Sequence, residues 1–502
     1  MKYKSVLINI AIILGFMLIV SANVFIQQLS NLDEIWIYNF GRCIINGLLP
    51  YKDFSIIITP LFAYISAAFL RLFGDEMIVL RFAEVIQTAL ILFMVYKILE
   101  RLKVNKGISL LFSLGLYNLY SSVFCYDYNW AVLLLSLVVI YIELGQEKTL
   151  QFNLKKDLAI GIVAGISILL KQTSGAVLAT AVIMYKTFEI RDKKSAKEFL
   201  NIALTRLLGV LIPVLLFAIY LTANDIWTEF IDYSILGIKT FSNVIPYTRL
   251  LESGYILAYV IPIFLSIIII ISIVTSIIKK TRESKWAKDL RILTFFDIAT
   301  TIVIYPIADR MHFSVGTLCT LITTAYMVNI WFVYGLKIES IKVKLAFNTF
   351  FNVAAVLLFI IQIVISTYSV VTHIKSIKDE EYFNHFKYIE VEKNIYEAIT
   401  KIDEYIENQE DKDVLILDSM AAAINIPIDK YYKNYDMFNL GNFGSKGENG
   451  IIEDLKFRKN TLILIKKGKY KTNWQHPNKI IDYVRSNFKH IDEIEVFDVY
   501  SK

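Results

Sequence analysis

Long apolar runs recur along the sequence between about residue 5 and residue 371, and they limit what the chain can fold into. Runs of 18 residues or more are long enough to cross about 30 Å of hydrocarbon as helices. With 56% hydrophobic residues and a mean hydropathy of +0.53, an ordinary soluble protein is excluded. Apolar windows predict helices over 5–25, 56–73, 77–99, 107–124, 129–144, 158–171, 174–190, 202–222, 254–278, 290–308, 314–336 and 344–371. The predicted fold is therefore that of an all-α polytopic membrane protein.

Short basic loops between these helices predict the topology. Lys and Arg concentrate in cytoplasmic loops, which here would be 97–106, 155–156, 191–197, 279–288 and 337–344. The basic N-terminus is then cytoplasmic, whereas Asp127, Thr173, the loop 223–253 and the stretch 309–312 lie outside. Twelve crossings would conflict with a cytoplasmic 97–106 loop, so 11 or 13 crossings are predicted, most simply because 56–73 does not span fully.

From about residue 376 onward the composition becomes mixed and charged, without another run that could span. Residues 381–407 have the period of an amphipathic helix, and DVLILD, NTLILI and EIEVFDVY are predicted strands. The stretch 439–450, with four glycines, is predicted to be a mobile loop. Two domains are expected: a transmembrane domain over 1–372, with outer loops 26–55 and 223–253, and a small extracytoplasmic α/β domain over 373–502.

Charge and cysteine usage exclude other classes. A net charge of +6 is small for 502 residues and is dispersed, so nucleic acid is not an expected partner. Cys43, Cys125 and Cys319 are too far apart in sequence for a zinc motif or a disulfide framework. No Gly-rich phosphate loop follows any predicted strand, which disfavours nucleotide binding.

A polar and aromatic stretch, residues 30–54, interrupts the apolar pattern near the N-terminus. Asp33 and Glu34 precede a short predicted helix, where acids favour the exposed N–H groups and the helix dipole. A carboxylate at an outer membrane surface can also remove a proton from an acceptor hydroxyl. Both interpretations stay open from these residues alone.

The strings DEIWIYNFGRCIINGLLPYKDF and TPLFAYISAAFLRLFGDEMIVLR resemble the first outer loop of the GT-C fold glycosyltransferases and the segments after it. The branch is that of the protein O-mannosyltransferases and the lipid A aminoarabinose transferases, and the resemblance extends over about residues 5–340. It implies an inverting membrane enzyme that moves a sugar from a polyprenyl-phosphate donor to a cell-envelope acceptor. Asp33 matches the family's proposed catalytic base, and Glu34 completes the acidic pair. Tyr51 and Asp53 lie in a string found beside the active site of relatives, and they are predicted to position substrate.

Later motifs carry the same resemblance. Asp127 in CYDYNW occupies the place of a second acid, and Lys171 in GISILLKQTSG is suited to neutralise a lipid-linked phosphate. In YPIADRMHFSV, Arg310 and His312 are predicted to bind donor phosphate and Asp309 to position substrate. The alternatives are a helix cap at Asp127, a snorkelling Lys171 and an Asp309–Arg310 surface pair. The aminoarabinose transferases have a Lys-Pro-Pro-Leu run at the position of Ile58-Thr59-Pro60-Leu61, so the lysine of that run is missing here.

Two or three of these carboxylates together with one histidine could bind a divalent metal ion. No two of these ligands have i, i+4 spacing, so no metal or other cofactor is assigned. The expected partners are the polyprenyl-phosphate sugar, the lipid bilayer and an envelope acceptor. Two rivals remain: a transporter or flippase of lipid-linked sugars, which would show repeated halves, and a non-enzymatic scaffold for envelope assembly.

Overall fold

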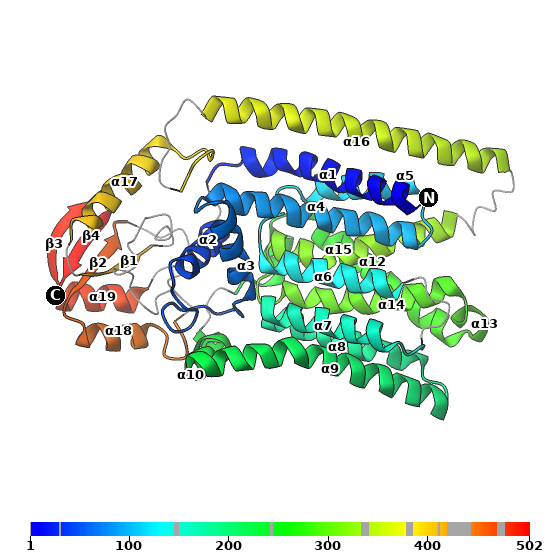
Figure 1. The fold of residues 1–502 in the computed structure, drawn as a ribbon, viewed down its shortest axis with the longest axis horizontal. Coiled ribbons are helices and arrows are strands. Elements are labelled where there is room, and N and C mark those ends of the chain that lie inside the picture. Colours follow the sequence, from blue (N-terminus) through cyan, green and yellow to red (C-terminus); the bar gives the residue numbers. More distant parts are fainter. Residues whose placement is uncertain are drawn as a thin grey trace. The chain divides into compact units, whose positions relative to one another are not determined.

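The computed structural model describes residues 2–29, 32–144, 150–240, 244–332, 341–377, 385–409, 412–418, 443–468 and 477–502. Figure 1 shows the helices and strands of the chain. The chain divides into two compact units. Unit 1 comprises Met1–Val24, Glu84–Phe217 and Ile245–Thr372. Unit 2 comprises Phe25–Ala83, Ala218–Val244 and His373–Lys502.

Unit 1 is helical, and four of its helices run on into segments of unit 2. Those four are α1 (Lys2–Ile26), α4 (Met77–Arg101), α9 (Lys193–Asn224) and α16 (Ile341–Ile377). The others are α5 (Lys106–Tyr120), α6 (Tyr128–Glu143), α7 (Leu154–Leu170), α8 (Gln172–Met184), η1 (Tyr185–Glu189), α11 (Tyr247–Glu252), α12 (Ile256–Ile277), α13 (Lys279–Arg282), α14 (Lys285–Thr300), η4 (Thr301–Ile304) and α15 (Arg310–Ile330).

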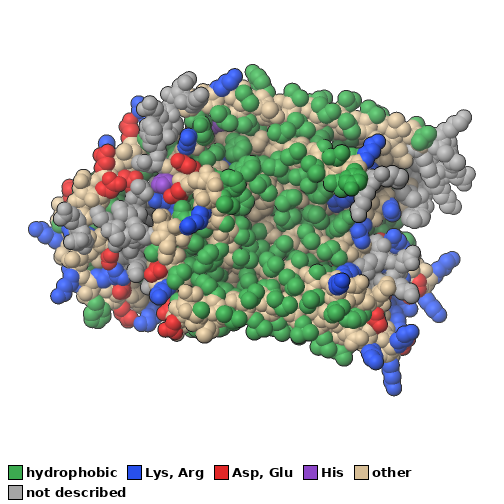
Figure 2. Space-filling model, viewed as in Figure 1, with side chains coloured by type: hydrophobic (Ala, Val, Ile, Leu, Met, Phe, Trp, Pro, Cys, Tyr) green, Lys and Arg blue, Asp and Glu red, His purple; other side chains and the backbone are tan. Residues whose placement is uncertain are grey.

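Six helices in the described part of the chain are long and apolar enough to cross a membrane: Tyr3–Ile26, Met77–Arg101, Lys193–Asn224, Ile256–Ile277, Arg310–Ile330 and Leu345–Ile377. Hydrophobic side chains cover the visible face of the unit 1 helices, and Lys and Arg gather at the end of these helices near α13 (Figure 2). Shorter helices such as α6 pack among them, so the number of crossings, 11 or 13, stays a prediction.

Glycines allow the closest helix contacts of unit 1. A Cβ added at Gly161 in α7 would overlap the carbonyl oxygen of Arg206 in α9, and one at Gly209 would lie 2.5 Å from the carbonyl oxygen of Leu158. Only residues without a side chain permit backbones to approach so closely. The glycines therefore bring α9 against the first half of α7, which fixes the position of Arg206.

Unit 2 contains α2 (Leu32–Ile45), α3 (Leu61–Phe73), α10 (Trp227–Ile231), η2 (Asp232–Leu236), η3 (Gly237–Thr240) and the C-terminal α17 (Lys393–Glu407). Its sheet has the order β1–β2–β4–β3, from β1 (Asp413–Leu417), β2 (Thr461–Lys466), β3 (Lys489–Ile494) and β4 (Phe497–Ser501). β1 and β2 are parallel, and the other two pairings are antiparallel. α18 (Glu448–Phe457) and α19 (Asn478–Asn487) share an apolar core with this sheet.

Four local predictions are wrong. The helix predicted over 56–73 begins only at Leu61, after Pro60, which fits the first turn of a helix and not its middle. The helix predicted over 381–407 begins at Lys393. EIEVFDVY forms the end of β3, a turn and β4, not one strand. Within 439–450, residues 439–442 lie outside the described part, and Glu448–Gly450 begin α18.

Candidate functional site

Asp127 in unit 1 caps α6. Its backbone is extended, and its carboxylate oxygen Oδ1 accepts a hydrogen bond of 2.7 Å from the N–H of Asn129. The side chain is buried, and the backbone carbonyl of Asp127 accepts from the amide of Gln87 at 3.3 Å. Asp127 is therefore a helix cap, as the alternative interpretation predicted. Its carboxylate can also interact with a neighbouring positive charge.

Lys171 is a single extended residue between α7 and α8. Its N–H bonds back to the carbonyl of Ser167, and its carbonyl accepts from Gly175, which lets one helix end and the next begin. An added Cβ at Gly175 would overlap Ser167, so this tight junction requires glycine. The ammonium of Lys171 lies 2.7 Å from Oδ1 of Asn129 and 5.1 Å from the centre of the Tyr128 ring.

The stretch 309–312 forms the start of α15. Oδ1 of Asp309 accepts from the His312 N–H at 2.8 Å and lies 2.9 Å from the His312 Nδ1 atom. Arg310 is exposed, with its guanidinium 5.1 Å from the centre of the Tyr255 ring. Among the described ion pairs Asp309 has His312 and not Arg310 as partner, so the alternative of an Asp309–Arg310 surface pair is wrong.

These three loops converge. Lys171 interacts electrostatically with both Asp127 and Asp309, and Asp127 also interacts with His312. The sequence placed the three segments on one side of the membrane, and the structure brings four of their charged or titratable side chains into one cluster. We call Asp127, Lys171, Asp309 and His312 the loop cluster.

The two carboxylates and the lysine of the loop cluster lie outside the helices, at their caps. Their pKa values are shifted by burial and by opposite charges nearby. Burial raises the pKa of Asp127 above its usual value, although the charges of Lys171 and His312 oppose this. Burial also lowers the pKa of Lys171 to about 8, against the opposing effect of the two carboxylates. Burial alone would raise the pKa of Asp309, but the hydrogen bonds and charge of His312 bring it below its usual value.

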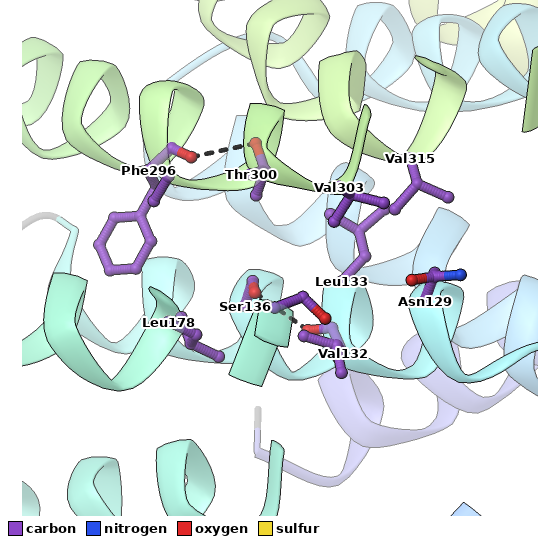
Figure 3. Close-up of a pocket in the computed structure, with 11 residues that line it drawn as sticks. Asn129, Val132, Leu133, Ser136, Leu178, Phe296, Thr300, Val303 and Val315 are labelled. Atoms are coloured by element: carbon purple, nitrogen blue, oxygen red, sulfur yellow. Dashed lines mark hydrogen bonds between the residues drawn. The ribbon is translucent and has the colours of Figure 1, made fainter. Parts of the chain in front are cut away.

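A small cavity adjoins the loop cluster through Asn129. Its volume is about 20 Å³, and apolar side chains from α6, α8, α14, η4 and α15 line most of it, among them Leu133, Phe296 and Val315 (Figure 3). The Ser136 and Thr300 hydroxyls each bind a carbonyl of their own helix. The Ser174 hydroxyl is buried at the same cavity without a hydrogen-bond partner among the described residues.

The acidic pair of the first loop lies in unit 2. α2 begins at Leu32, so Asp33 and Glu34 occupy its first turn, as acids that favour the dipole do. Glu34 forms a two-point ion pair with Arg81, with Nε–Oε1 at 2.6 Å and Nη2–Oε2 at 3.2 Å. Arg81 is buried and also donates to the carbonyls of Gln27 and Gln28. Glu34 therefore anchors α2. Asp33 is half-buried, and its role as the base stays a prediction.

Tyr51 and Asp53 shape a turn in unit 2. The Tyr51 side chain is fully buried, and its hydroxyl donates to the carbonyl of Ile58 at 2.8 Å. Asp53 accepts from the N–H of Leu49 at 2.9 Å and closes the turn. Packing and turn formation account for both contacts, and the predicted substrate-positioning roles stay predictions.

Metal ligands converge elsewhere. Among the described residues the one group that could hold an ion is His490, Glu493 and Asp498 on β3 and β4. Glu493 there already pairs with Lys467 at 2.6 Å. No metal is therefore assigned to the loop cluster.

Comparisons with known proteins bear on this architecture. The family model described as dolichyl-phosphate-mannose-protein mannosyltransferase matches residues 58–217, less than half of the chain but including Asp127 and Lys171. The crystal structure of ArnT from Cupriavidus metallidurans bound to undecaprenyl phosphate is similar over 100% of this chain and 98% of that one, with a TM-score of 0.55 and 12% identity. The apo state of the same protein gives a TM-score of 0.53 and 11% identity, over 99% and 98%.

The chain has the GT-C fold. This confirms the predicted all-α polytopic membrane architecture with a small C-terminal sheet region. The resemblance to the GT-C glycosyltransferases is likewise confirmed, and family and fold together indicate a glycosyltransferase in a multi-pass membrane protein. A search of curated proteins finds no match.

Two residues that the sequence analysis did not single out contact predicted site residues. Asn129 holds the Lys171 ammonium, and Arg81 holds Glu34. Asn129 sits in CYDYNW beside the chosen Asp127, so its position in that motif was a usable signal. Arg81 is separated from Glu34 by 47 residues, and no local pattern connects them.

Proposed function

We propose that this protein transfers a sugar from a polyprenyl-phosphate donor to a cell-envelope acceptor, with inversion, at the outer face of the membrane. The N-terminus would be cytoplasmic and the C-terminal domain extracytoplasmic. The relative with the similar fold was crystallised with undecaprenyl phosphate, which supports a donor of this class. The observation that carries the proposal is the Lys171 ammonium, which Asn129 holds within the loop cluster.

Lys171 has the chemistry that the leaving group requires. Its ammonium has three donors, of which Asn129 uses one, so phosphate oxygens can take the others. In the half-buried position of this side chain, attraction between opposite charges is stronger than in water. Asp127 and Asp309 counter the cost of burying the cation while the donor is absent.

The remaining residues of the three loops would position the donor. Arg310 is exposed and ends in a planar fork suited to phosphate oxygens. Asp309 orients the His312 ring, which leaves the Nε2 atom of that ring for a sugar or phosphate oxygen. Apolar side chains line most of the cavity that adjoins the cluster, which lowers the polarity on that side.

The reaction balances as a single displacement. The acceptor oxygen forms a bond to the anomeric carbon, and the bond from that carbon to the phosphate oxygen breaks. The bonding electrons leave with the polyprenyl phosphate, whose charge Lys171 neutralises. The acceptor proton goes to a carboxylate, and Asp33 is our prediction for that base because of its match to the family.

The test uses purified full-length protein with a polyprenyl-phosphate sugar that carries radiolabel in the sugar. We expect Lys171→Met to reduce release of polyprenyl phosphate at least about 100-fold, a loss typical for removal of one charge-stabilising donor. Lys155→Gln, at the other end of the same helix, is the matched control and should keep full activity. Full activity in the Lys171→Met protein would refute the assigned role.

Asp33 is tested separately. Asp33→Asn keeps size and hydrogen bonding but cannot accept the proton, so transfer should fall by at least about 100-fold while expression and folding persist. Glu34→Gln should retain more activity, because its role is to anchor α2. An Asp33→Asn protein that transfers sugar normally would remove Asp33 as the base and leave the Lys171 assignment intact.

A further inference from the structure

A second charged cluster is buried at the opposite end of α6 and α7. Its members are Glu143, Lys156, Asp157, Lys186 and Arg206, and we call it the lower cluster. α6 begins after Asp127 and ends at Glu143, so its 16 residues place the two clusters roughly 24 Å apart. The lower cluster is therefore separate from the loop cluster.

Arg206 makes the well-formed contacts of the lower cluster. Its Nε and Nη2 atoms lie 2.9 and 2.7 Å from Oδ1 of Asp157, and Nη2 lies 2.6 Å from Oε1 of Glu143. Nη1 donates to the carbonyl of Val182. The Tyr185 hydroxyl donates to the other carboxylate oxygen of Glu143, and the Asn153 N–H donates to Asp157. One arginine thus pairs with both carboxylates.

With Arg206 already paired to both carboxylates, the two lysines bring the positive charge of the cluster above its negative charge. The ammonium groups of Lys156 and Lys186 are 3.4 and 3.5 Å from Glu143, too far for good hydrogen bonds. Neither Nζ atom has a hydrogen-bond partner among the described residues, although both atoms are buried. The Lys186 side chain is only 1% exposed. The cluster therefore holds three cations against two carboxylates.

A buried cation without a hydrogen-bonding partner is costly, because it loses the hydrogen bonds of water and the nearby Glu143 carboxylate offsets only part of that loss. Two such ammonium groups beside one shared carboxylate also repel each other. An anion that accepts hydrogen bonds from both would remove the surplus charge and supply acceptors for their free N–H groups. A phosphate group, with several oxygens, has this chemistry.

The surroundings identify the source of the phosphate. The Lys156 side chain is 21% exposed, so the lower cluster reaches the molecular surface on that side. Phe152, two residues before α7, Leu154 at its start and Phe188 in η1 expose large apolar side chains. Basic groups between helices with exposed apolar side chains beside them match the chemistry of a lipid headgroup and the beginning of its acyl chains. We propose that Lys156 and Lys186 bind the phosphate of an anionic phospholipid, independently of the sugar transfer.

The test measures the thermal midpoint Tm of the detergent-purified full-length protein during titration with dioctanoyl phosphatidylglycerol. A ligand that binds the folded state raises Tm with its concentration, which gives an apparent Kd. We expect Lys186→Met, and separately Lys156→Gln, to weaken this Kd about tenfold or more, the value of a lost hydrogen bond to a charged group. Lys155→Gln should match the wild type.

Three further arms make the result decisive. Dioctanoyl phosphatidylcholine, which has no net charge, should give little response. A response to inorganic phosphate equal to that of the lipid would keep the site and assign it to soluble phosphate. Lys171→Met should retain the lipid response; loss of the response there would overturn the proposal, because the lipid would then occupy the loop cluster.

Stability without lipid provides the last check. Lys186→Met leaves two cations against two carboxylates, so in lipid-free detergent its Tm should equal or exceed that of the wild type. A markedly lower Tm would show that Lys186 is simply an ion-pair partner of Glu143. Equal lipid affinity in the wild type and both lysine variants would also refute the proposal.

Discussion

Replacement of Arg206 by Met should destabilise the protein strongly, because it removes the one cation that bridges both carboxylates of the lower cluster. The Arg206 side chain is fully buried, and its two carboxylate partners are each 1% exposed. Loss of one partner of a buried ion pair generally costs about 3–5 kcal/mol of unfolding free energy. Met has a similar apolar volume, so the loss is of charge and hydrogen bonds and not of packing.

The contacts around each carboxylate narrow this magnitude. After the replacement, Lys156 and Lys186 can move the short distance to Glu143 and compensate it. Asp157 would keep only the hydrogen bond from the N–H of Asn153. One carboxylate, Asp157, and not both, loses its direct ion pair, so we expect the low end of the range, about 3 kcal/mol.

A matched control exists in unit 2. Arg458 also bridges two carboxylates, those of Asp413 and Asp454, but its side chain is 25% exposed. Arg458→Met should cost at most about 1 kcal/mol, because solvent screens and replaces the pairs. Unfolding in detergent, followed by tryptophan fluorescence against denaturant, compares the two variants. Equal losses would refute the argument from burial.

A second variant separates uncompensated charge from general damage. Adding Asp157→Asn to Arg206→Met removes the carboxylate that the single variant leaves without a cation. The double variant should therefore be more stable than Arg206→Met alone, since a buried neutral amide costs less than a buried charge. A double variant that is less stable would show that the carboxylate was not the source of the loss.

Three further predictions concern other parts of the chain. Gly161→Ala should lower Tm, because the new methyl group overlaps the carbonyl oxygen of Arg206, whereas Gly115→Ala, with open space around it, should leave Tm unchanged or raise it; thermal unfolding of both proteins checks this. Arg81→Met should cost about 3 kcal/mol and release α2, which trypsin cleavage within residues 26–46 would report; unchanged protection would contradict the anchoring role. Burial lowers the pKa of Lys171 to about 8, and Lys171 binds phosphate only in its protonated form, so kcat/KM for the donor should fall as pH rises above 8. Lys171→Arg should extend activity to higher pH, and identical pH profiles of the two proteins would exclude Lys171 as the titrating group.

The apolar helices were largely predictable, because membrane spans leave the strongest pattern that a sequence can carry. The predicted 77–99 and 254–278 correspond to α4 and α12 within about two residues. The error at 381–407 has a physical cause. Ile389 and Val391 are buried, as a helical face would be, but His385 and Tyr388 have positive φ. The N–H groups of Leu29 and Met77 bind carbonyls of this segment, so it pairs with distant backbone and does not coil.

The hairpin of β3 and β4 was missed because its turn lacks the usual residues. Glu495 takes the positive φ that Gly or Asn normally occupies in such turns. The chain tolerates this because β4 is paired on both sides, with β2 and with β3, and its ladder determines the register. Local propensity therefore gave way to tertiary pairing.

The loop cluster was predictable in membership but not in geometry. Basic loops predicted that Asp127, Lys171 and the 309–312 stretch share one side of the membrane, which is information about topology. Which side chains pair is decided by helix ends: Asp309 caps α15 and so turns toward His312, two residues beyond the Arg310 that sequence proximity favoured. Capping, in this case, selects the partner.

Both charged clusters occupy ends of the same two helices, and the contrast between them is informative. A buried charge survives in a protein only when its partners offset the lost hydration. In the loop cluster one lysine stands between two carboxylates, and its cation is compensated before any donor arrives. In the lower cluster the balance is reversed, because three cations face two carboxylates and one positive charge is in excess. A site that must release its phosphate product benefits from competing carboxylates, whereas a site with surplus cations retains its anion. Under the two proposals, the same helix pair would serve turnover at one end and stable anion binding at the other.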